Sequence, residues 1–134
     1  MASLCCTEEV VMATSSDMLH TAKPYLSIVI PVFNEAAILE TLCSRLSSVL
    51  SPITDDYEVI FVNDGSTDSS FQQLTEMAAG DRRFRVIDLS RNFGHQMAIT
   101  AGLQYASGMA VIIMDGDLQD PPELIPSFLE KWKD

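Results

Sequence analysis

The 134-residue sequence has little cysteine and little positive charge. Its three cysteines, Cys5, Cys6 and Cys43, give neither a disulfide framework nor a paired CxxC metal site, because the number is odd and two are adjacent. A reducing compartment is the simpler interpretation. Eight basic residues against 19 acidic ones give a formal net charge of −11. That charge argues against nucleic acid as a partner and against a polybasic membrane patch, since both need clustered lysine and arginine.

Long apolar runs and several familiar catalytic motifs are also absent. No apolar run approaches the ~18 residues needed to span a bilayer. The N-terminus carries Glu8 and Glu9 instead of a basic region followed by an apolar stretch, so it does not look like a secretory signal. The sequence contains no Gly-x-Gly-x-x-Gly, Walker or Gly-x-Ser-x-Gly motif and no metal-ligand histidine pair, which argues against redox-cofactor enzymes and serine hydrolases. We therefore expect a soluble, cytoplasmic protein of another class.

The length and composition of the chain predict one packed domain, since 47% of the residues are apolar and 20% are charged. Residues 1–23 lack a clear period and are predicted to be a weakly ordered leader, and the folded part is expected to span 24–134. Short β-branched runs predict strands at 26–32, 57–62, 84–89 and 109–114. Helical spacing and turn residues predict helices at 35–50, 69–79, 94–106 and from 121 to the end of the chain. This alternation predicts an α/β fold with a parallel sheet and helices on both faces.

Polar residues follow each predicted strand. Glu35 follows the first, Asp64 the second, Arg91 the third, and Asp115 with Asp117 the fourth. Ligands of open parallel sheets bind beyond the carboxyl ends of the strands, near the point where strand order reverses. If the first and fourth strands are neighbours, Glu35, Asp64 and Asp115 line one crevice.

Asp115-Gly116-Asp117 is the strongest candidate site. Two carboxylates directly after a buried strand offer the hard oxygen ligands that Mg²⁺ and Mn²⁺ prefer, and Gln119 adds a carbonyl oxygen. Asp120 is expected to cap the helix that follows. An isolated Asp-x-Asp is more often a surface turn, but its position after the strand of a parallel sheet favours a metal site here.

The other motifs have structural alternatives. Asp64 can accept a nucleobase N–H, and Ser66 with Thr67 can cap the next helix, whose N-terminus can face an anion. Asp64 is the residue of this group that we expect to be functional. Glu35 fits helix capping as well as base or ribose recognition.

The motif after the third strand offers one further candidate. Arg91 is a candidate phosphate ligand. His95 is interpreted as a polar cap rather than a general base. A stripe of small residues is interpreted as a close packing surface: Gly94, Ala98, Gly102 and Ala106.

Four motifs together resemble glycosyltransferase family 2. They are 30–35, 62–68, 91–95 and 115–123, in the same order and register as in the family, and the resemblance covers about residues 25–134. The extended run Leu118-Gln119-Asp120-Pro121-Pro122 is similar to the polyprenyl-phosphate (dolichol- or undecaprenyl-phosphate) branch.

The resemblance implies a GT-A-type, Rossmann-like sheet and inverting transfer of a sugar from a UDP- or GDP-sugar to a polyprenyl phosphate. It implies a nucleoside site at Pro31, Asn34, Glu35 and Asp64, with Val32, Ser66 and Arg91 as further substrate-binding candidates. It implies that Asp115, Asp117 and Gln119 handle Mg²⁺ or Mn²⁺ and the diphosphate, which makes Asp115 and Asp117 the catalytic candidates.

Two departures from the family pattern limit these expectations. Met109 stands where relatives usually have an acidic residue, a position expected to be structural. The family's catalytic domain continues well past residue 134, so we expect a truncated, incomplete or inactive donor-binding half whose sheet exposes an edge and an apolar face. Activity of this chain alone and self-association into a homo-oligomer stay open. The alternatives are a non-catalytic nucleotide-binding or interaction module and an unrelated, receiver-like doubly wound domain.

Overall fold

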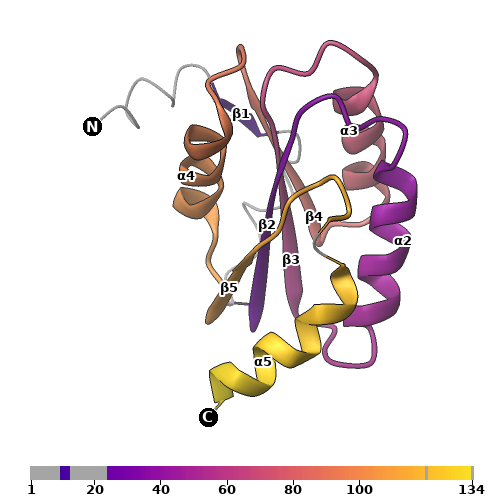
Figure 1. The fold of residues 1–134 in the computed structure, drawn as a ribbon, viewed down its shortest axis with the longest axis vertical. Helices are drawn as coiled ribbons and strands as arrows, with labels where there is room; N and C mark the ends of the chain where they lie inside the picture. Colours follow the sequence, from indigo (N-terminus) through magenta and orange to yellow (C-terminus); the bar gives the residue numbers. More distant parts are fainter. Residues whose placement is uncertain (1–9, 13–23, 120, 134) are drawn as a thin grey trace.

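A computed structural model describes residues 10–12, 24–119 and 121–133 (Figure 1). Its strands are β1 (Val10–Met12), β2 (Leu26–Val32), β3 (Tyr57–Asn63), β4 (Phe84–Leu89) and β5 (Ala110–Ile113). Its helices are α2 (Leu39–Leu50), α3 (Ser70–Gly80), α4 (His95–Tyr105), the short 3-10 turn η2 (Pro122–Leu124) and α5 (Ile125–Lys133). The predicted alternation of strands and helices is confirmed.

The strands form one sheet in the order β1-β4-β3-β2-β5. Strands β4, β3, β2 and β5 are parallel, and β1 pairs antiparallel with β4. The sequence predicts no strand at 10–12, and the rest of the predicted leader, 1–9 and 13–23, lies outside the described residues. Because β2 lies between β3 and β5, strand order reverses at β2. The first and fourth predicted strands are therefore neighbours, which is the condition for a shared crevice.

Helices cover both faces of the sheet. Helix α4 lies over β2, β3 and β4 on one face, while α2, α3 and α5 lie on the other (Figure 1). Every residue of β2 and β3 is buried, as expected for strands covered on both sides. A Cβ on Gly102 would lie 2.4 Å from Val29 Cγ1, so this glycine lets α4 pack directly on β2. The structural interpretation of the small-residue stripe is confirmed there.

All four predicted helices begin later in the structure than the sequence predicts, α3 and α4 by one residue and the other two by four. Helix α2 begins at Leu39 and not at 35, because the chain turns at Asn34, whose φ is 55°. Helix α3 begins at Ser70, so Ser66 and Thr67 lie too far upstream to cap it, and that prediction is wrong. The last helix is preceded by the η2 turn, and the capping residue predicted for it, Asp120, lies outside the described residues.

The other side of the sheet ends at β5, which is an edge strand with exposed apolar side chains. Among the described strands, β5 thus has the exposed apolar edge that the sequence predicts. None of the helices in the described ranges is both long and apolar enough to span a bilayer.

Candidate functional site

A cleft of about 300 Å³ opens at the carboxyl ends of β2, β3 and β5. All four sequence motifs contribute to its lining: Pro31, Val32, Phe33, Glu35, Asp64, Asn92, Gly94, His95, Asp115, Gly116 and Asp117. The expectation that Glu35, Asp64 and Asp115 share one crevice is confirmed as geometry. Strand order explains it, because the reversal at β2 leaves a gap between the loops that leave β2 and β5.

Asp64 is buried at the floor of this cleft and joins two of its loops. Its backbone N–H donates to Val32 O (2.8 Å). Its carboxylate accepts the backbone N–H of Phe93 (Oδ1, 2.8 Å) and that of Gly94 (Oδ2, 3.2 Å). A carboxylate has about four acceptor sites, so each oxygen can still accept a bond from a ligand. Asp64 therefore fixes the loop between β4 and α4 and still faces the cleft.

Asn34 and Ser66 join the loops behind the cleft. The Asn34 N–H donates to Ser66 Oγ (2.9 Å), and Asn34 Oδ1 accepts the Thr67 N–H (2.7 Å). Neither side chain belongs to the cleft lining. The left-handed backbone at Asn34 turns the side chain toward the 66–68 loop, so these two predicted substrate-binding residues support the site from outside.

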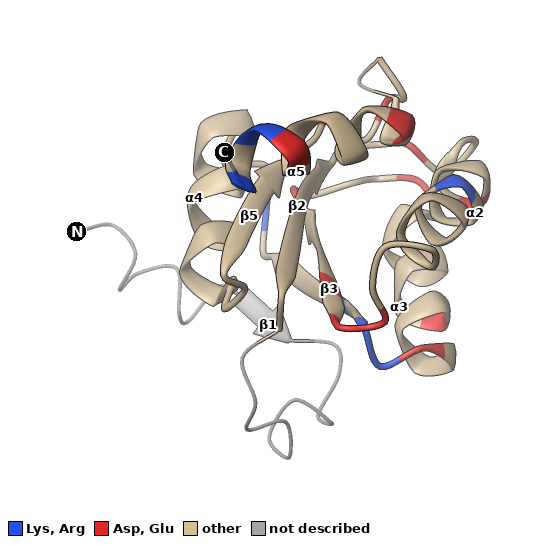
Figure 2. Cartoon of the chain, turned by 90° about the horizontal axis from the view of Figure 1, so that it is seen from below, with Lys and Arg blue, Asp and Glu red and all other residues tan. Residues whose placement is uncertain are grey.

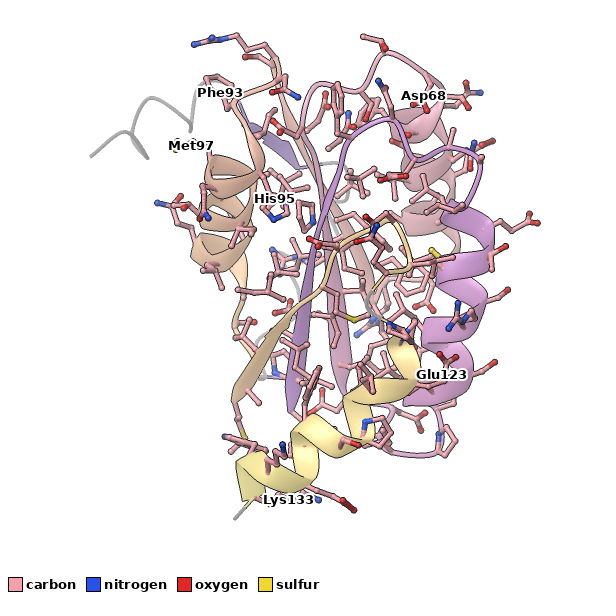
Figure 3. The ribbon with its side chains drawn as sticks, viewed as in Figure 1. Asp68, Phe93, His95, Met97, Glu123 and Lys133 are labelled. Carbon is pink, nitrogen blue, oxygen red and sulfur yellow. The ribbon has the colours of Figure 1, made fainter. Side chains whose placement is uncertain are left out.

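Glu35 lies in an environment that opposes its negative charge. Partial burial raises the pKa of its carboxyl group, and the charges of Asp117 and Asp68 raise it further. The Glu35 N–H donates to Ser70 Oγ (3.0 Å), which anchors the turn that carries it. Asp68, labelled in Figure 3, lies at the start of α3, where a hydrogen bond from Ser70 lowers its pKa.

The turn after β5 carries the two predicted metal ligands. The Met114 N–H donates to Val29 O (2.9 Å), so β5 stays in register with β2 up to Met114, the residue before Asp115. A Cβ on Gly116 would lie 3.1 Å from Pro31 O, and glycine therefore lets the turn pack on the end of β2. Asp117 Oδ1 accepts the Gln119 N–H (3.0 Å), which holds that carboxylate in a local turn.

His95 lies opposite Asp115, with Nε2 3.4 Å from Asp115 Oδ1. Its label in Figure 3 lies on the side of α4 that faces β2. Helix α4 has no side-chain cap hydrogen bond, so the interpretation of His95 as a polar cap is wrong. Among the described residues, it is the one potentially cationic side chain that lines the cleft.

Arg91 and Gln119 do not line the cleft. The Arg91 guanidinium carbon lies 4.2 Å from the centroid of the Phe93 ring, an exposed cation–π contact at the rim. Gln119 is exposed and contacts Asp117 through its backbone N–H. Their predicted roles as ligands of phosphate and cation stay predictions.

The carboxylates at the cleft suit a divalent cation that takes its remaining ligands from water and from a substrate. Within the described ranges, no group of three or more histidine, cysteine or carboxylate side chains is arranged to hold a metal ion. Asp115 and Asp117 offer two carboxylates at the cleft, and after burial the charge of Asp117 is the next cause that raises the pKa of Glu35. Mg²⁺ and Mn²⁺ commonly complete their coordination with water and substrate phosphates, which two protein carboxylates suit.

Sequence reasoning missed three side chains of the lining: Phe33, Asn92 and His95. All three lie inside motifs that the sequence singles out. Phe33 carried the clearest signal, because an aromatic residue directly after a fully buried strand ends exposed at the cleft mouth. Attention to charged residues alone hides such positions.

The sequence model described as Glycosyl transferase family 2 matches residues 27–134. The chain is 52% identical over 108 residues to the uncharacterized glycosyltransferase YkcC of Bacillus subtilis, covering 81% of this chain and 33% of YkcC. It is 43% identical over 115 residues to an undecaprenyl-phosphate 4-deoxy-4-formamido-L-arabinose transferase of Aeromonas hydrophila, covering 84% of this chain and 35% of that protein. The chain thus spans about a third of the length of the curated relatives it matches.

A solved structure shares the fold. The mannosyltransferase PcManGT of Pyrobaculum calidifontis, in complex with GDP-Man and Mn²⁺, matches with a TM-score of 0.69 at 24% identity, covering 84% of this chain and 33% of that one. The fold is therefore of the GT-A type, and an unrelated receiver-like domain is excluded. Since the family model matches most of the sequence, including all four motifs around the cleft, the chain belongs to glycosyltransferase family 2.

Proposed function

We propose that this chain binds a nucleoside-diphosphate sugar and a divalent cation, as the donor-binding part of an inverting glycosyltransferase that uses a polyprenyl phosphate as acceptor. The observation that carries the proposal is the cleft, where the carboxylates of Glu35, Asp64, Asp115 and Asp117 converge. A diphosphate alone would be repelled by this charge. A cation that binds both the carboxylates and the diphosphate makes the two compatible.

The residues that line the cleft and those beside it have separate roles in this proposal. Asp64 and Glu35 face the nucleoside as hydrogen-bond acceptors, beside Pro31 and Val32 at the end of β2. Asn34 and Ser66 hold the loops in place, and Arg91 at the rim is available to a phosphate. Asp115 and Asp117 hold Mg²⁺ or Mn²⁺, with Gln119 beside them. When bound, such a cation stabilises the negative charge that develops on the departing nucleoside diphosphate.

The proposed acceptor follows from the relatives. One of them is an undecaprenyl-phosphate sugar transferase. A phosphate oxygen is already anionic and needs little help from a general base, which agrees with a cleft built from acidic groups. Since this chain spans about a third of such relatives, we assign donor binding to this chain and transfer, at the cytoplasmic face of a membrane, to the whole protein.

Calorimetry tests donor binding. UDP and GDP are titrated into the chain with and without Mn²⁺, and at least one nucleotide should bind in a cation-dependent manner. Asp117→Asn should abolish the cation dependence, since it removes the charge but keeps an acceptor for the Gln119 N–H. Asp55→Asn is the matched control, because Asp55 is exposed and lies away from the cleft.

Sugar transfer to a polyprenyl phosphate then separates an enzyme from a non-catalytic nucleotide-binding module. Binding with transfer indicates an enzyme, and binding without transfer in the whole protein indicates the module. A folded chain that binds neither nucleotide in the presence of Mn²⁺ contradicts the proposal.

A further inference from the structure

A bidentate ion pair joins helix α2 to the segment that follows residues 115–119, the cation turn. Arg45 Nε donates to Glu123 Oε2 (3.1 Å), and Arg45 Nη2 donates to Glu123 Oε1. Arg45 is the basic residue of α2, which has a blue segment in Figure 2, and Glu123 lies in η2, beside α2 in Figure 3. Two parallel hydrogen bonds fix the direction of the partner as well as its distance. The pair therefore holds η2 in a defined orientation on α2.

The ion pair lies outside the cleft and is partly exposed. The side chains of Arg45 and Glu123 are 35% and 54% exposed, and neither lines the cleft. Exposed ion pairs contribute little to the free energy of unfolding, because solvent screens them and two long side chains lose freedom. Burial of Pro122 and Ile125 already attaches the segment to the fold. Since such burial is non-directional, the contribution left to the ion pair is orientation.

The cation turn contains a strained backbone position. Leu118 has a φ of 66°, in the left-handed region that leucine rarely adopts, and its side chain packs against the core. Such a conformation persists only where the surrounding structure over-determines it. Before the turn, the Met114 N–H donates to Val29 O (2.9 Å) and fixes the chain to the sheet. After the turn comes η2, so the ion pair supplies the second fixed point.

We propose that Arg45 and Glu123 are positioning residues for the cation turn. The inference rests on the proposed function, which gives the two aspartates of the turn to a divalent cation. A turn that is fixed on both sides has fewer conformations to lose when the cation binds, so binding costs less conformational entropy. Without the pair, η2 loses its orientation on α2, the backbone at Leu118 relaxes, and the Asp117 carboxylate samples other positions. The cation must then order the turn itself.

Two single variants separate positioning from long-range charge. Arg45→Gln makes the chain more negative and Glu123→Gln makes it less negative, so charge alone would shift cation affinity in opposite directions. Positioning predicts the same direction for both. In calorimetry with UDP or GDP, the Mn²⁺ concentration at half-maximal nucleotide binding should rise about threefold to tenfold. At saturating Mn²⁺ the nucleotide Kd should match that of the parent, because the cation has then ordered the turn.

A charge-swapped variant and two matched controls complete the set. Arg45→Glu/Glu123→Arg keeps the net charge and can form the pair in reverse, so the half-saturating Mn²⁺ concentration should return toward the parent value. Arg82→Gln and Glu40→Gln change the charge by the same amounts at exposed positions outside the cleft, and should leave that concentration unchanged. Urea unfolding should place every variant close to the parent, since the pair is exposed.

Hydrogen exchange measures the order of the turn without any ligand. The Gln119 N–H donates to Asp117 Oδ1 (3.0 Å). In the cation-free chain this N–H should exchange faster in Arg45→Gln and in Glu123→Gln than in the parent, because the turn opens more often. The Met114 N–H, which is bonded within the sheet, is the internal control and should keep its rate.

The outcomes distinguish this inference from the proposed function. If the parent binds nucleotide with Mn²⁺ but the two single variants match it, or shift the half-saturating concentration in opposite directions, the inference alone is overturned. If the single variants unfold more easily and bind nucleotide weakly even at saturating Mn²⁺, the pair is structural and the inference is again overturned. A folded parent that binds neither nucleotide with Mn²⁺ contradicts the proposed function, and the role toward a cation with it.

Discussion

The surroundings of Glu58, buried at the amino end of the sheet, and of Glu35, partly buried at the carboxyl end, differ in how they compensate a negative charge. At the amino end, the Glu58 carboxylate accepts hydrogen bonds from Arg85 Nη1 (2.6 Å), from the Ser107 N–H (2.8 Å) and from Ser27 Oγ. The Gly108 N–H donates to Ser27 Oγ (2.8 Å) and extends the network. At the carboxyl end, no arginine or lysine of the described residues pairs with Glu35 in this way, and the charges of Asp117 and Asp68 act on it.

The pKa values show what the difference means. Burial alone raises the pKa of Glu58, but the hydrogen bonds from Ser107, Ser27 and Arg85 outweigh burial and lower it overall. Burial raises the pKa of Glu35 as well, and the neighbouring carboxylates raise it further. A carboxylate that supports the fold is fully paired, whereas one that the fold leaves uncompensated is available to a ligand.

The largest expected effect comes from breaking the paired end. Arg85→Leu should lower the free energy of unfolding by about 3–5 kcal/mol, because it leaves the buried Glu58 charge unpaired. Urea unfolding measures the loss. The double variant Arg85→Leu/Glu58→Leu should recover much of it, since no charge then remains buried. Arg82→Leu is the control, because Arg82 is exposed, and it should change stability by about 0.5 kcal/mol at most. A single variant as stable as the control would mean that this end is not held by its ion pair.

The cleft end is held instead by close backbone packing, and Gly65→Ala should break it. Gly65 has a φ of 72°, and a Cβ there would lie 2.3 Å from the Asn92 backbone N. We expect a loss of about 1–3 kcal/mol in thermal or urea unfolding, from strain and displacement of the loop after β4. Gly80→Ala is the matched control, since nothing lies within 4 Å of its Cβ position and it ends α3. Equal effects of the two changes would count against this packing contact.

Glu58 and Glu35 should also make contributions of opposite sign to the pH dependence of stability, with smaller effects than the two changes above. The lowered pKa of Glu58 contributes stability that is present above its ordinary value of 4.5 and is lost as pH falls through the folded-state value. The raised pKa of Glu35 has the opposite sign: its contribution is present at low pH and is lost as pH rises through the folded-state value. Urea unfolding between about pH 6 and pH 3 should therefore show a shallower acid loss for Glu58→Gln than for the parent, and a steeper one for Glu35→Gln. If the free energy of unfolding fell equally with pH in the parent, Glu58→Gln and Glu35→Gln, then the two carboxylates would not differ in this respect.

The sequence predicts the scaffold of both ends better than their side-chain contacts. Runs such as Leu26–Val32 and Phe84–Leu89 are β-branched and bounded by turns, and the structure has these strands at the predicted bounds. Strand β1 is not predicted, because three residues carry too little pattern and their pairing depends on β4, far along the chain. The Glu58 network is hidden for the same reason, since its partners Ser27 and Ser107 are distant in sequence.

At the candidate site, too, the positions of the residues could be predicted from the sequence better than the directions of their side chains. Topology alone brings Glu35, Asp64 and Asp115 to one crevice, because each follows a strand whose neighbours are set by the fold. The direction of Asn34 depends on one left-handed backbone position, and that of Arg91 on a ring two residues away. The periodicity of strands and helices in the sequence does not predict such side-chain directions.

We expect Glu35→Gln to have the smallest effect on stability. This variant tests whether Glu35 serves a ligand, in contrast to Glu58, which supports the fold. Removing a charge that Asp117 and Asp68 already oppose should leave the free energy of unfolding at neutral pH within about 0.5 kcal/mol of the parent, or slightly above it. The same change should weaken cation-dependent nucleotide binding in calorimetry, because the acceptor facing the nucleoside loses its charge. Glu40→Gln, on the exposed side of α2, should alter neither property. If Glu35→Gln weakens nucleotide binding and leaves the free energy of unfolding unchanged, then Glu35 serves the ligand and not the fold. If Glu35→Gln instead destabilises the chain as Arg85→Leu does, then Glu35 supports the fold and the two ends of the sheet do not differ in the way their charges suggest.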